Sequence, residues 1–491
     1  MSNLAVLPII IPLLAGILVA FFNKKVVVTR LLSKIFIVIH LLVTAYVTML
    51  VFKDGSIVLE TGSWVAPYGI IFVADYLSII LVLTTAILST ACIFISPRLV
   101  SERKEQYYFY TFFFMLISGV SGAFLTGDLF NLFVFFEVLL MASYGMIVLG
   151  GDKAQLRESL KYVLINLFSS IVFVTTVAFL YAVVGTVNMA HIAERVHEVE
   201  QQGILTTIGI VLFFVFATKA ALFPLYYWMP KSYVVPDPVT SAVFGALLTK
   251  VGIYSIIRVF TLIFVYEDNL IRNFFIIVAG LSMVFGVIGA LSTNDIKLLV
   301  AYNVIPSIGF ILLGLAVFNE SGLAGSAYYL VHDMIIKAAL FLIVGVITYA
   351  AGTSDLRKMG GLINYYPVLG WILFVAAFVL AGIPPFSGFI GKLLLLQGAF
   401  EADHIFIVIV GLVTSLLILY SVMKIFIHGF WGEKQPNFKV QKTTGMLSPI
   451  VFLLAFSVFM GVGAEYVYPH METLSAYLLD PEIYINSVLK E

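Results

Sequence analysis

Apolar runs separated by short polar breaks cover almost the whole chain. Fourteen of these runs are long enough for a membrane helix, because about 20 residues are needed to cross the apolar core of a bilayer. They cover residues 4–22, 31–52, 75–97, 108–126, 129–150, 160–185, 204–230, 239–265, 272–292, 296–318, 322–351, 366–400, 405–428 and 448–466. The breaks are too short for a globular domain. The pattern therefore predicts an all-α, polytopic membrane protein with about 14 transmembrane helices.

Lysine and arginine are distributed unevenly between the breaks. Breaks after odd-numbered runs hold 17 of these residues, whereas breaks after even-numbered runs and the two tails hold 4. The first group includes Lys434 and Lys439, and the second includes Lys490. Because cytoplasmic loops carry an excess of positive charge, the bias predicts that both termini lie outside. It also favours an even number of spans.

Composition excludes several other classes of protein. Of the 491 residues, 62% are hydrophobic and 11% are charged, whereas soluble domains are about 25% charged. A water-soluble multidomain enzyme is therefore excluded, and the zero net charge gives no electrostatic case for a nucleic-acid partner. A single cysteine, Cys92, excludes a disulfide framework and thiolate zinc or iron–sulfur sites. No cofactor, metal site or catalytic residue is predicted.

Three smaller features carry expectations of their own. Residues 56–72 alternate around a turn-like Thr-Gly-Ser, which predicts a small external hairpin. Residues 187–202 place apolar side chains at helical spacing among charges, which is typical of an interfacial helix. Ordinary solvated loops are the alternative for both segments. His40, alone among apolar residues of the second run, is expected to be a core histidine with satisfied hydrogen bonds.

Six cations fall inside the predicted spans. Arg258 and Lys424 lie within about two turns of their helix ends, from which their side chains can reach the lipid headgroups. The other four sit well inside their spans: Lys219, Lys250, Lys337 and Lys392. A charge at the bilayer centre is costly. Four such lysines therefore predict a polar pathway through the protein interior.

A deep carboxylate accompanies these lysines. Glu137 lies well inside the fifth run. Burial disfavours the charged form of lysine and a nearby carboxylate favours it again, so a lysine whose partner can approach and retreat is a switchable proton site. Glu137 and Lys219, on separate helices, are candidates for such a pair. The alternative is a static ion pair that fixes helix packing.

Prolines break two predicted helices beside a lysine. Pro224 follows Lys219 in the seventh run, and Pro384 and Pro385 precede Lys392 in the twelfth. Proline removes a hydrogen-bond donor, and non-helical backbone at membrane depth is tolerated only inside protein or along a cavity. Two broken helices are typical of transporters built from inverted repeats.

The breaks also indicate how the chain is divided. Spans four to eight, residues 108–265, and spans nine to thirteen, residues 266–428, place the two broken spans in corresponding positions. The offset of five spans is odd, which makes the two five-helix repeats inverted. Residues 1–107 hold three spans and the hairpin, and residues 429–491 hold the last span and an external tail. We expect symmetry of fold rather than of chemistry, because the lysine precedes the break in one half and follows it in the other.

Five segments resemble the antiporter-like subunits shared by respiratory complex I and Mrp-type multisubunit cation/proton antiporters. These segments are Phe135–Glu137, Lys219–Pro230, Leu248–Tyr254, His332–Phe341 and Gly382–Lys392. The resemblance covers nearly the whole chain. Within the family, the tract from Phe223 to Tyr233 is most similar to the D-type subunits of Mrp sodium/proton antiporters.

The resemblance implies fourteen helices, two inverted five-helix repeats and a line of charged residues along the membrane midplane. It implies the following proton-transfer residues: Glu137 and Lys219 as the first-half pair, Lys250 as a bridge, His332 and Lys337 as links, and Lys392 as the terminal site. Asp333 departs from the family pattern, in which a second histidine often stands. Four residues before Lys337 on one helix face, Asp333 can pair with it and modulate it.

Three hypotheses follow. The first is a proton-translocating subunit of a sodium/proton antiporter in a bacterial cell membrane, with a large A-type subunit and small membrane subunits as partners. The second is a proton-pumping subunit of a redox-driven complex, either NADH:quinone oxidoreductase or a membrane hydrogenase. The third is an assembly scaffold with inert charges. The first two need almost the same chemistry in this chain, which contains no flavin, nucleotide or iron–sulfur motif.

Overall fold

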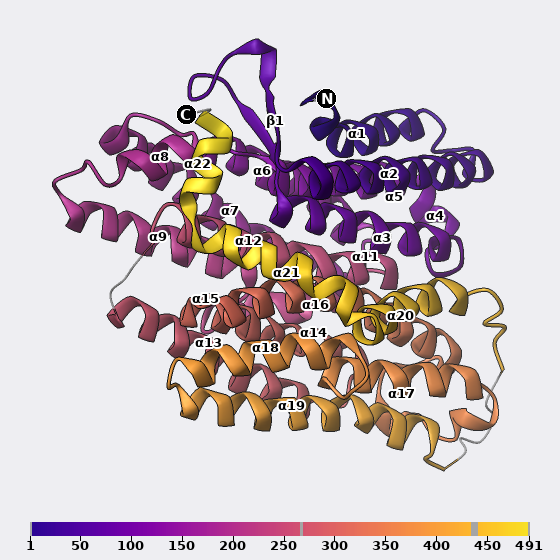
Figure 1. Ribbon diagram of the computed structural model, residues 1–491. Coiled ribbons are helices and arrows are strands. Elements are labelled where there is room, and N and C mark those ends of the chain that lie inside the picture. The colour runs from indigo at the N-terminus through magenta and orange to yellow at the C-terminus, as the bar shows by residue number, and fades with distance from the viewer. Residues whose placement is uncertain (1, 266–268, 434–439, 490–491) are drawn as a thin grey trace.

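The computed structural model describes residues 2–265, 269–433 and 440–489, so Lys434, Lys439 and Lys490 lie outside the described residues. Long helices run side by side through one bundle, and a hairpin projects from it (Figure 1). Helices dominate because a helix satisfies its own backbone hydrogen bonds, as a lipid environment requires.

The N-terminal region contains three long helices and the predicted hairpin. Strands β1 (Ile57–Glu60) and β2 (Ile71–Ala74) pair antiparallel, with Ile57 opposite Ala74. The hairpin prediction is therefore confirmed. The helices of this region are η1 (Ser2–Val6), α1 (Leu7–Ala20), α2 (Val26–Asp54), η2 (Thr61–Ser63), α3 (Tyr76–Leu99) and α4 (Glu102–Gln106).

The first repeat contains one helix interrupted by a break and another containing a π-helical turn. Its elements are α5 (Phe109–Leu125), α6 (Leu129–Val148), α7 (Lys153–Val184), α8 (Met189–Arg195), α9 (Gln202–Ala220), η3 (Leu225–Trp228), α10 (Met229–Val234), α11 (Pro238–Val243), the π-helical turn η4 (Phe244–Leu248) and α12 (Thr249–Leu262). The short helix α8 lies in the segment expected to be interfacial.

The second repeat and the C-terminal region follow. The second repeat contains α13 (Asn269–Ser292), α14 (Ile296–Tyr302), α15 (Val304–Val317), α16 (Glu320–Ala351), η5 (Leu356–Lys358), η6 (Leu362–Asn364), α17 (Pro367–Ala381), α18 (Ser387–Glu401), α19 (Ile405–Ile425) and the π-helical turn η7 (Phe426–Phe430). The C-terminal region contains α20 (Leu447–Val462), α21 (Ala464–Leu479) and α22 (Pro481–Leu489). A 79° bend separates α20 from α21.

Two matching backbone bridges mark equivalent positions in the repeats. Asp128, before α6, pairs with Asn188 after α7, and Asp295, before α14, pairs with Asp355 after α16. Both members of the second bridge lie 167 residues after those of the first. The same hydrogen bonds close each bridge at 2.9–3.0 Å. Because five spans separate the bridges, they lie at opposite ends of the bundle, as inverted repeats require.

The number of membrane spans agrees with the expectation only approximately. Among the described residues, eleven helices are long and apolar enough to cross a membrane, or twelve if the bent pair α20–α21 is one span. Two shorter apolar helices, α5 and α17, add to these. The exact count of fourteen therefore stays a prediction. The segment expected as a tail contains α21, which packs along α16, and α22, which packs against α8 (Figure 1).

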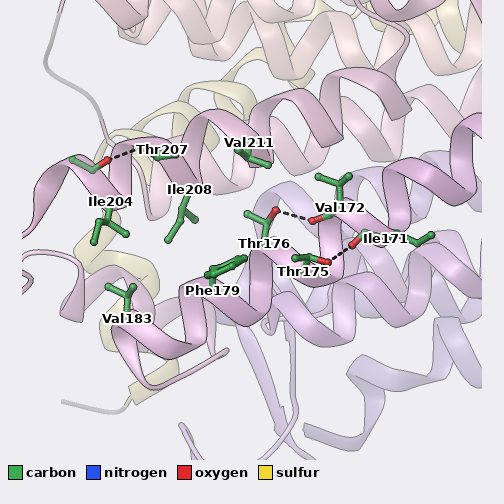
Figure 2. A pocket seen from close by; sticks show the side chains of 11 residues that line it. Ile171, Val172, Thr175, Thr176, Phe179, Val183, Ile204, Thr207, Ile208 and Val211 are labelled. Atoms are coloured by element: carbon green, nitrogen blue, oxygen red, sulfur yellow. Dashed lines mark hydrogen bonds between the residues drawn. The ribbon is translucent and has the colours of Figure 1, made fainter.

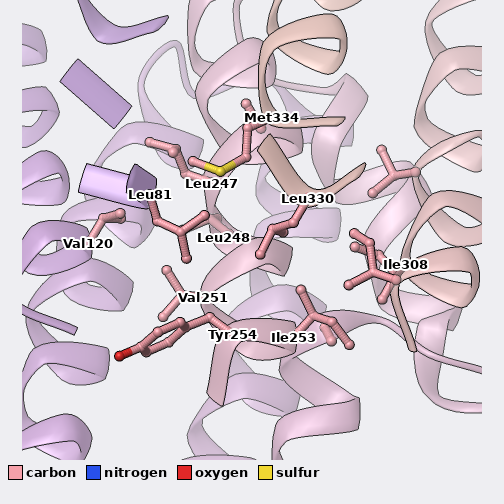
Figure 3. Packing of buried hydrophobic residues seen from close by; sticks show 14 of the residues in the cluster. Leu81, Val120, Leu247, Leu248, Val251, Ile253, Tyr254, Ile308, Leu330 and Met334 are labelled. Atoms are coloured by element: carbon pink, nitrogen blue, oxygen red, sulfur yellow. The ribbon is translucent and has the colours of Figure 1, made fainter. Parts of the chain in front are cut away.

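The centre of the molecule is formed by α12. Every residue of this helix is buried, as is typical of a helix that is surrounded by protein on all sides. Figure 3 shows Leu248 and Val251 packed among Leu81 of α3, Val120 of α5 and Leu330 of α16. The N-terminal region and both repeats therefore meet around η4 and α12, and α12 carries Lys250.

One expectation about a single residue is wrong, and a second is right about burial but wrong about hydrogen bonds. Arg258 does not reach the lipid headgroups: its side chain is 3% exposed and forms an ion pair with Asp75 at the start of α3. The ring of Tyr484 on α22 lies 5.0 Å from the guanidinium, so the C-terminal helices close its route to lipid. His40 is fully buried, and neither ring nitrogen has a hydrogen-bond partner among the described residues. The helix of His40, α2, packs along α3.

Candidate functional site

Lys219 lies in the last turn of α9, immediately before the break that Pro224 introduces. Its ammonium donates a hydrogen bond to the Ser170 hydroxyl at 3.1 Å and lies 4.8 Å from the centre of the Phe136 ring. The side chain is buried. Beyond the lysine the chain turns through Ala221 at φ +60°, and Phe223 N–H donates to Ser282 of α13. The carboxyl end of a helix favours a cation.

Glu137 follows Phe136 on α6 but does not contact Lys219. Within the described residues, no oxygen of this carboxylate comes within 4.0 Å of the Lys219 nitrogen. Glu137 is half-buried, and its Oε1 has no hydrogen-bond partner among the described residues. The structure therefore brings the helices of this predicted pair together while keeping the two charges apart.

Asp333 lies between two lysines, and we call these three residues the junction cluster. Its Oδ2 lies 2.7 Å from Lys250 Nζ on α12, and its Oδ1 lies 3.4 Å from Lys337 Nζ on its own helix α16. All three side chains are fully buried. The cluster joins a helix of the first repeat to a helix of the second.

Each lysine of the junction cluster also has a neutral partner. Lys250 Nζ donates to the carbonyl of Gly245 at 2.7 Å, and Lys337 Nζ donates to the carbonyl of Asn303 at 2.8 Å. Both carbonyls belong to irregular backbone. Gly245 lies in the π-helical turn before α12, and Asn303 lies between α14 and α15. Helix irregularities of this kind are frequent at functional sites.

His332 connects the second break to α20. Its Nδ1 lies 2.8 Å from the Ser387 hydroxyl, which lies 2.6 Å from the hydroxyl of Ser457. Neither serine is among the residues predicted from the sequence. Ser387 could have been found, because it is a polar residue inside a proline- and glycine-rich break. Ser457 is a single serine in an apolar run and has no comparable signal.

The two prolines of the second break prepare the contacts of Lys392. In a helix, the carbonyls of Leu380 and Ala381 would accept from the backbone nitrogens of residues 384 and 385, and proline has no N–H to donate. Lys392 Nζ donates to these two carbonyls, at 3.1 and 2.8 Å. The lysine follows its break in sequence, yet its ammonium lies at the carboxyl end of α17.

The predicted residues do not form one continuous chain of contacts. The junction cluster is one group, and His332 with its two serines is a second. Glu137 and Lys219 are held separately, and Lys392 is linked to His332 through the ring of Tyr329, which lies 5.9 Å from the ammonium and 5.2 Å from the imidazole. Across gaps of this kind, polar groups are connected only by bridging water.

The apolar hollow between α7 and α9 offers no alternative site. It has a volume of 530 Å³ and is lined by side chains such as Ile171, Phe179 and Ile208. Figure 2 shows the hydroxyls of its threonines turned to carbonyls of their own helices, as in the 2.8 Å bond from Thr175 to Ile171. In the described part of the chain, no group of three or more His, Cys, Asp or Glu could hold a metal ion.

Comparison with known proteins bears on this arrangement of buried lysines. Residues 126–418 match the family described as NADH:quinone oxidoreductase/Mrp antiporter, transmembrane. The chain belongs to this family. The matched region includes Glu137, Lys392 and all the predicted proton-transfer residues between them. Family membership and the helices that are long and apolar enough to cross a membrane together show that this chain is a multi-pass membrane protein.

Relatives within the family match over the full length. The chain is 48% identical to the D-type subunit of the Na⁺/H⁺ antiporter of Alkalihalophilus pseudofirmus over 100% of both chains. It is also 48% identical to the D-type subunit of the Na⁺/H⁺ antiporter of Bacillus subtilis, again over 100% of both chains. A chain of the Mrp complex from Dietzia sp. DQ12-45-1b has the same fold, with a TM-score of 0.92, 29% identity and 99% coverage of both chains.

Proposed function

We propose that this chain is a proton-translocating subunit of a multisubunit Na⁺/H⁺ antiporter. The observation that carries the proposal is the burial of four lysines inside the bundle, where only one carboxylate, Asp333, forms ion pairs with them in the described residues. Charges in such surroundings are costly and mark ion or proton pathways. The full-length relatives, which are named as antiporter subunits, support the same conclusion.

Protons bind to the amines of the lysines in turn and move between them through water. Each group has a role in this scheme: Glu137 and Lys219 form the first-half pair, Lys250 is the bridge, His332 and Lys337 are links, and Lys392 is the terminal site. Lysine suits this work because burial and a nearby carboxylate act in opposite directions on its charge. Moving one proton changes the proton affinity of the next site, which couples the steps.

The surroundings of the chain belong to the same proposal. It works in a bacterial cell membrane, with both termini outside, beside a large A-type subunit and small membrane subunits. Its functional divisions are residues 1–107, 108–265, 266–428 and 429–491. The matching backbone bridges at the ends of the repeats support the two central divisions.

A test of the proposal measures proton movement in everted membrane vesicles that contain the whole complex. We expect Glu137→Ala and Lys219→Ala to lower the sodium-dependent rate by about tenfold or more, as is usual when a proton-transfer group is removed. Matched controls are Glu102→Ala and Lys53→Ala, whose side chains are exposed. Normal rates in correctly assembled Glu137 and Lys219 variants would reject the proposal. Unchanged proton movement after neutralising all four buried lysines would favour a scaffold.

The alternative is a proton-pumping subunit of a redox-driven complex. The family description includes NADH:quinone oxidoreductase, but the full-length relatives named above support the antiporter more strongly. Purifying the complex and identifying its subunits separates the two. Redox subunits would favour the alternative, whereas a long A-type relative and small membrane subunits would favour the antiporter.

A further inference from the structure

The junction cluster contains two cationic side chains and one anionic side chain. Lys250, Asp333 and Lys337 are fully buried. With both lysines protonated, the cluster carries one uncompensated positive charge, and with one protonated it is neutral. An uncompensated charge in a packed apolar interior is strongly unfavourable. The neutral arrangement, with one ammonium, one amine and one carboxylate, is therefore favoured.

The two contacts of Asp333 are unequal and use different oxygens. The distance from Oδ2 to Lys250 Nζ is 2.7 Å, whereas the distance from Oδ1 to Lys337 Nζ is 3.4 Å. The shorter distance is that of a close ion pair and the longer one is that of a looser pair, and the attraction between two charges falls with distance. In the arrangement that the structure shows, the carboxylate is engaged with Lys250, and Lys337 is held mainly by the Asn303 carbonyl.

The neutral partners allow the opposite arrangement. If Asp333 turns to Lys337, the carbonyl of Gly245 still holds Lys250. If it turns to Lys250, the carbonyl of Asn303 still holds Lys337. Neither lysine is left without an acceptor in either arrangement. The irregular backbone at both carbonyls thus makes two states of one cluster available without moving a helix.

We infer that Asp333 is a counter-ion shared by Lys250 and Lys337, which pairs with one ammonium at a time and so makes proton binding in one repeat displace a proton in the other. This inference rests on the proposed proton transport. It assigns Asp333 a positioning role, because the carboxylate stays ionised and carries no proton itself. Pairing with Lys337 alone, as the spacing of four residues indicates, would not link the repeats.

The exchange conserves charge and protons. A proton arrives at the Lys337 amine from water on the His332 side and forms a new N–H bond. The carboxylate turns to the new ammonium. Lys250, deprived of its counter-ion, then breaks one N–H bond and gives the proton to a water molecule on the Lys219 side. The cluster begins and ends neutral, and the same steps run in reverse.

Removal of the shared carboxylate tests the inference in vesicles that contain the whole complex. We expect Asp333→Asn, which removes the coupling between the two lysines, to lower the sodium-dependent proton rate per assembled complex by about tenfold or more, and Asp333→Glu to recover part of it. The matched control is Asp75→Asn, which removes a buried carboxylate from the ion pair with Arg258 outside the proposed pathway. We expect it to lower the amount of assembled complex but not the rate per complex.

A relocated carboxylate keeps the test decisive if Asp333→Asn does not assemble. Asn303 is fully buried, and its backbone carbonyl accepts from Lys337. The double variant Asp333→Asn/Asn303→Asp keeps one buried carboxylate in the second repeat, on the residue whose backbone holds Lys337, but moves it to a side chain that contacts Ser421 of α19 instead of Lys250. Restored assembly without transport would support the shared counter-ion, whereas restored transport would overturn it.

The outcomes separate this inference from the proposed function. Near-normal transport by Asp333→Asn, together with lost transport in Glu137→Ala and Lys219→Ala, would overturn the inference and leave the proposed function in place. Near-normal transport in all three variants would reject the proposed function itself.

Discussion

The surroundings of Lys219 and the junction cluster both hold lysine side chains in the protein interior, but they do so with different contacts. Each holds a buried lysine beside a helix irregularity, yet the first holds the ammonium with a hydroxyl and an aromatic ring. The second holds two lysines with one carboxylate and two backbone carbonyls. The carboxylate near Lys219, Glu137, remains out of contact. Glu137 and Lys219 are therefore an open pair, whose charges do not touch, whereas the charges of the junction cluster are in contact.

This difference shows which features the repeats share. The matching bridges, 167 residues apart, show that the backbone repeats closely. The broken helices also correspond, since Lys219 lies at the carboxyl end of the helix before its break and the Lys392 ammonium reaches the carboxyl end of the helix before its own break. The charged partners do not repeat. Shared backbone irregularities position lysines in both halves, and individual side chains then decide how each lysine is stabilised.

The largest expected effect is on stability. Asp333→Asn leaves two buried lysines without a counter-ion, and breaking a buried pair costs about 3–5 kcal/mol. Glu137→Gln breaks no ion pair and should cost much less. To check this, the purified complex of each variant is heated in detergent, and the temperature at which half of the complex has unfolded is measured. If both variants lose the same amount of thermal stability, Glu137 and Lys219 form an ion pair in the assembled complex.

The spacing between the two regions can be changed through Gly252. A Cβ on this residue of α12 would lie 2.5 Å from Ala220 N and 2.9 Å from the Lys219 carbonyl carbon. Gly252→Ala therefore pushes α12 away from α9, at a cost of about 1–3 kcal/mol, and should lower transport in vesicles. Gly203→Ala on α9 is the control, since a Cβ there would meet no described atom within 4 Å beyond its own helix backbone and chain neighbours. Unchanged transport in Gly252→Ala would show that the two regions work independently of their spacing.

A smaller effect is expected at Phe136. Its ring faces the Lys219 ammonium, and a contact of this kind contributes about 0.5–2 kcal/mol. Phe136→Leu keeps an apolar side chain but removes that contact, so the transport rate should change severalfold while assembly stays normal. Phe133→Leu alters a ring on the same helix that faces Phe173, and its rate should stay close to that of the parent. Identical transport rates in both variants would show that the Phe136 ring does not affect proton transfer at Lys219.

The smallest effect is expected at the bridges. Hydrogen bonds from the Arg357 side chain and backbone hold the pKa of Asp355 below its ordinary value, whereas the equivalent residue in the first repeat, Asn188, does not titrate. A carboxyl whose pKa is lowered by folding stabilises the protein at pH values above its pKa in the unfolded chain, which is about 3.9. This stabilisation is lost as the pH falls through its pKa in the folded protein. Asp355→Asn should therefore differ slightly from the parent in thermal stability at pH 7 and match it in strong acid. A difference that grows toward acid pH would contradict this sign.

Much of the fold could be predicted from local patterns. The hairpin is present, the broken helices lie at the predicted prolines, and the four lysines are buried. The expectation that Arg258 reaches lipid and the hydrogen bonds expected for His40 are wrong for one reason. Each was judged from its position along its own helix, whereas its surroundings are supplied by helices distant in sequence, namely α22 for Arg258 and α3 for His40.

The sequence by itself determined where helices form and where they break, because apolar runs and missing proline N–H groups act over a few neighbouring residues. It also determined that the buried lysines need polar partners. Only the tertiary structure decided which partners they have. Asp333 lies 83 residues from Lys250, yet the two atoms of the pair are 2.7 Å apart, while the predicted partners Glu137 and Lys219 are not in contact. The energy of a buried charge depends on atoms within a few ångströms, and helix packing alone brings such atoms together.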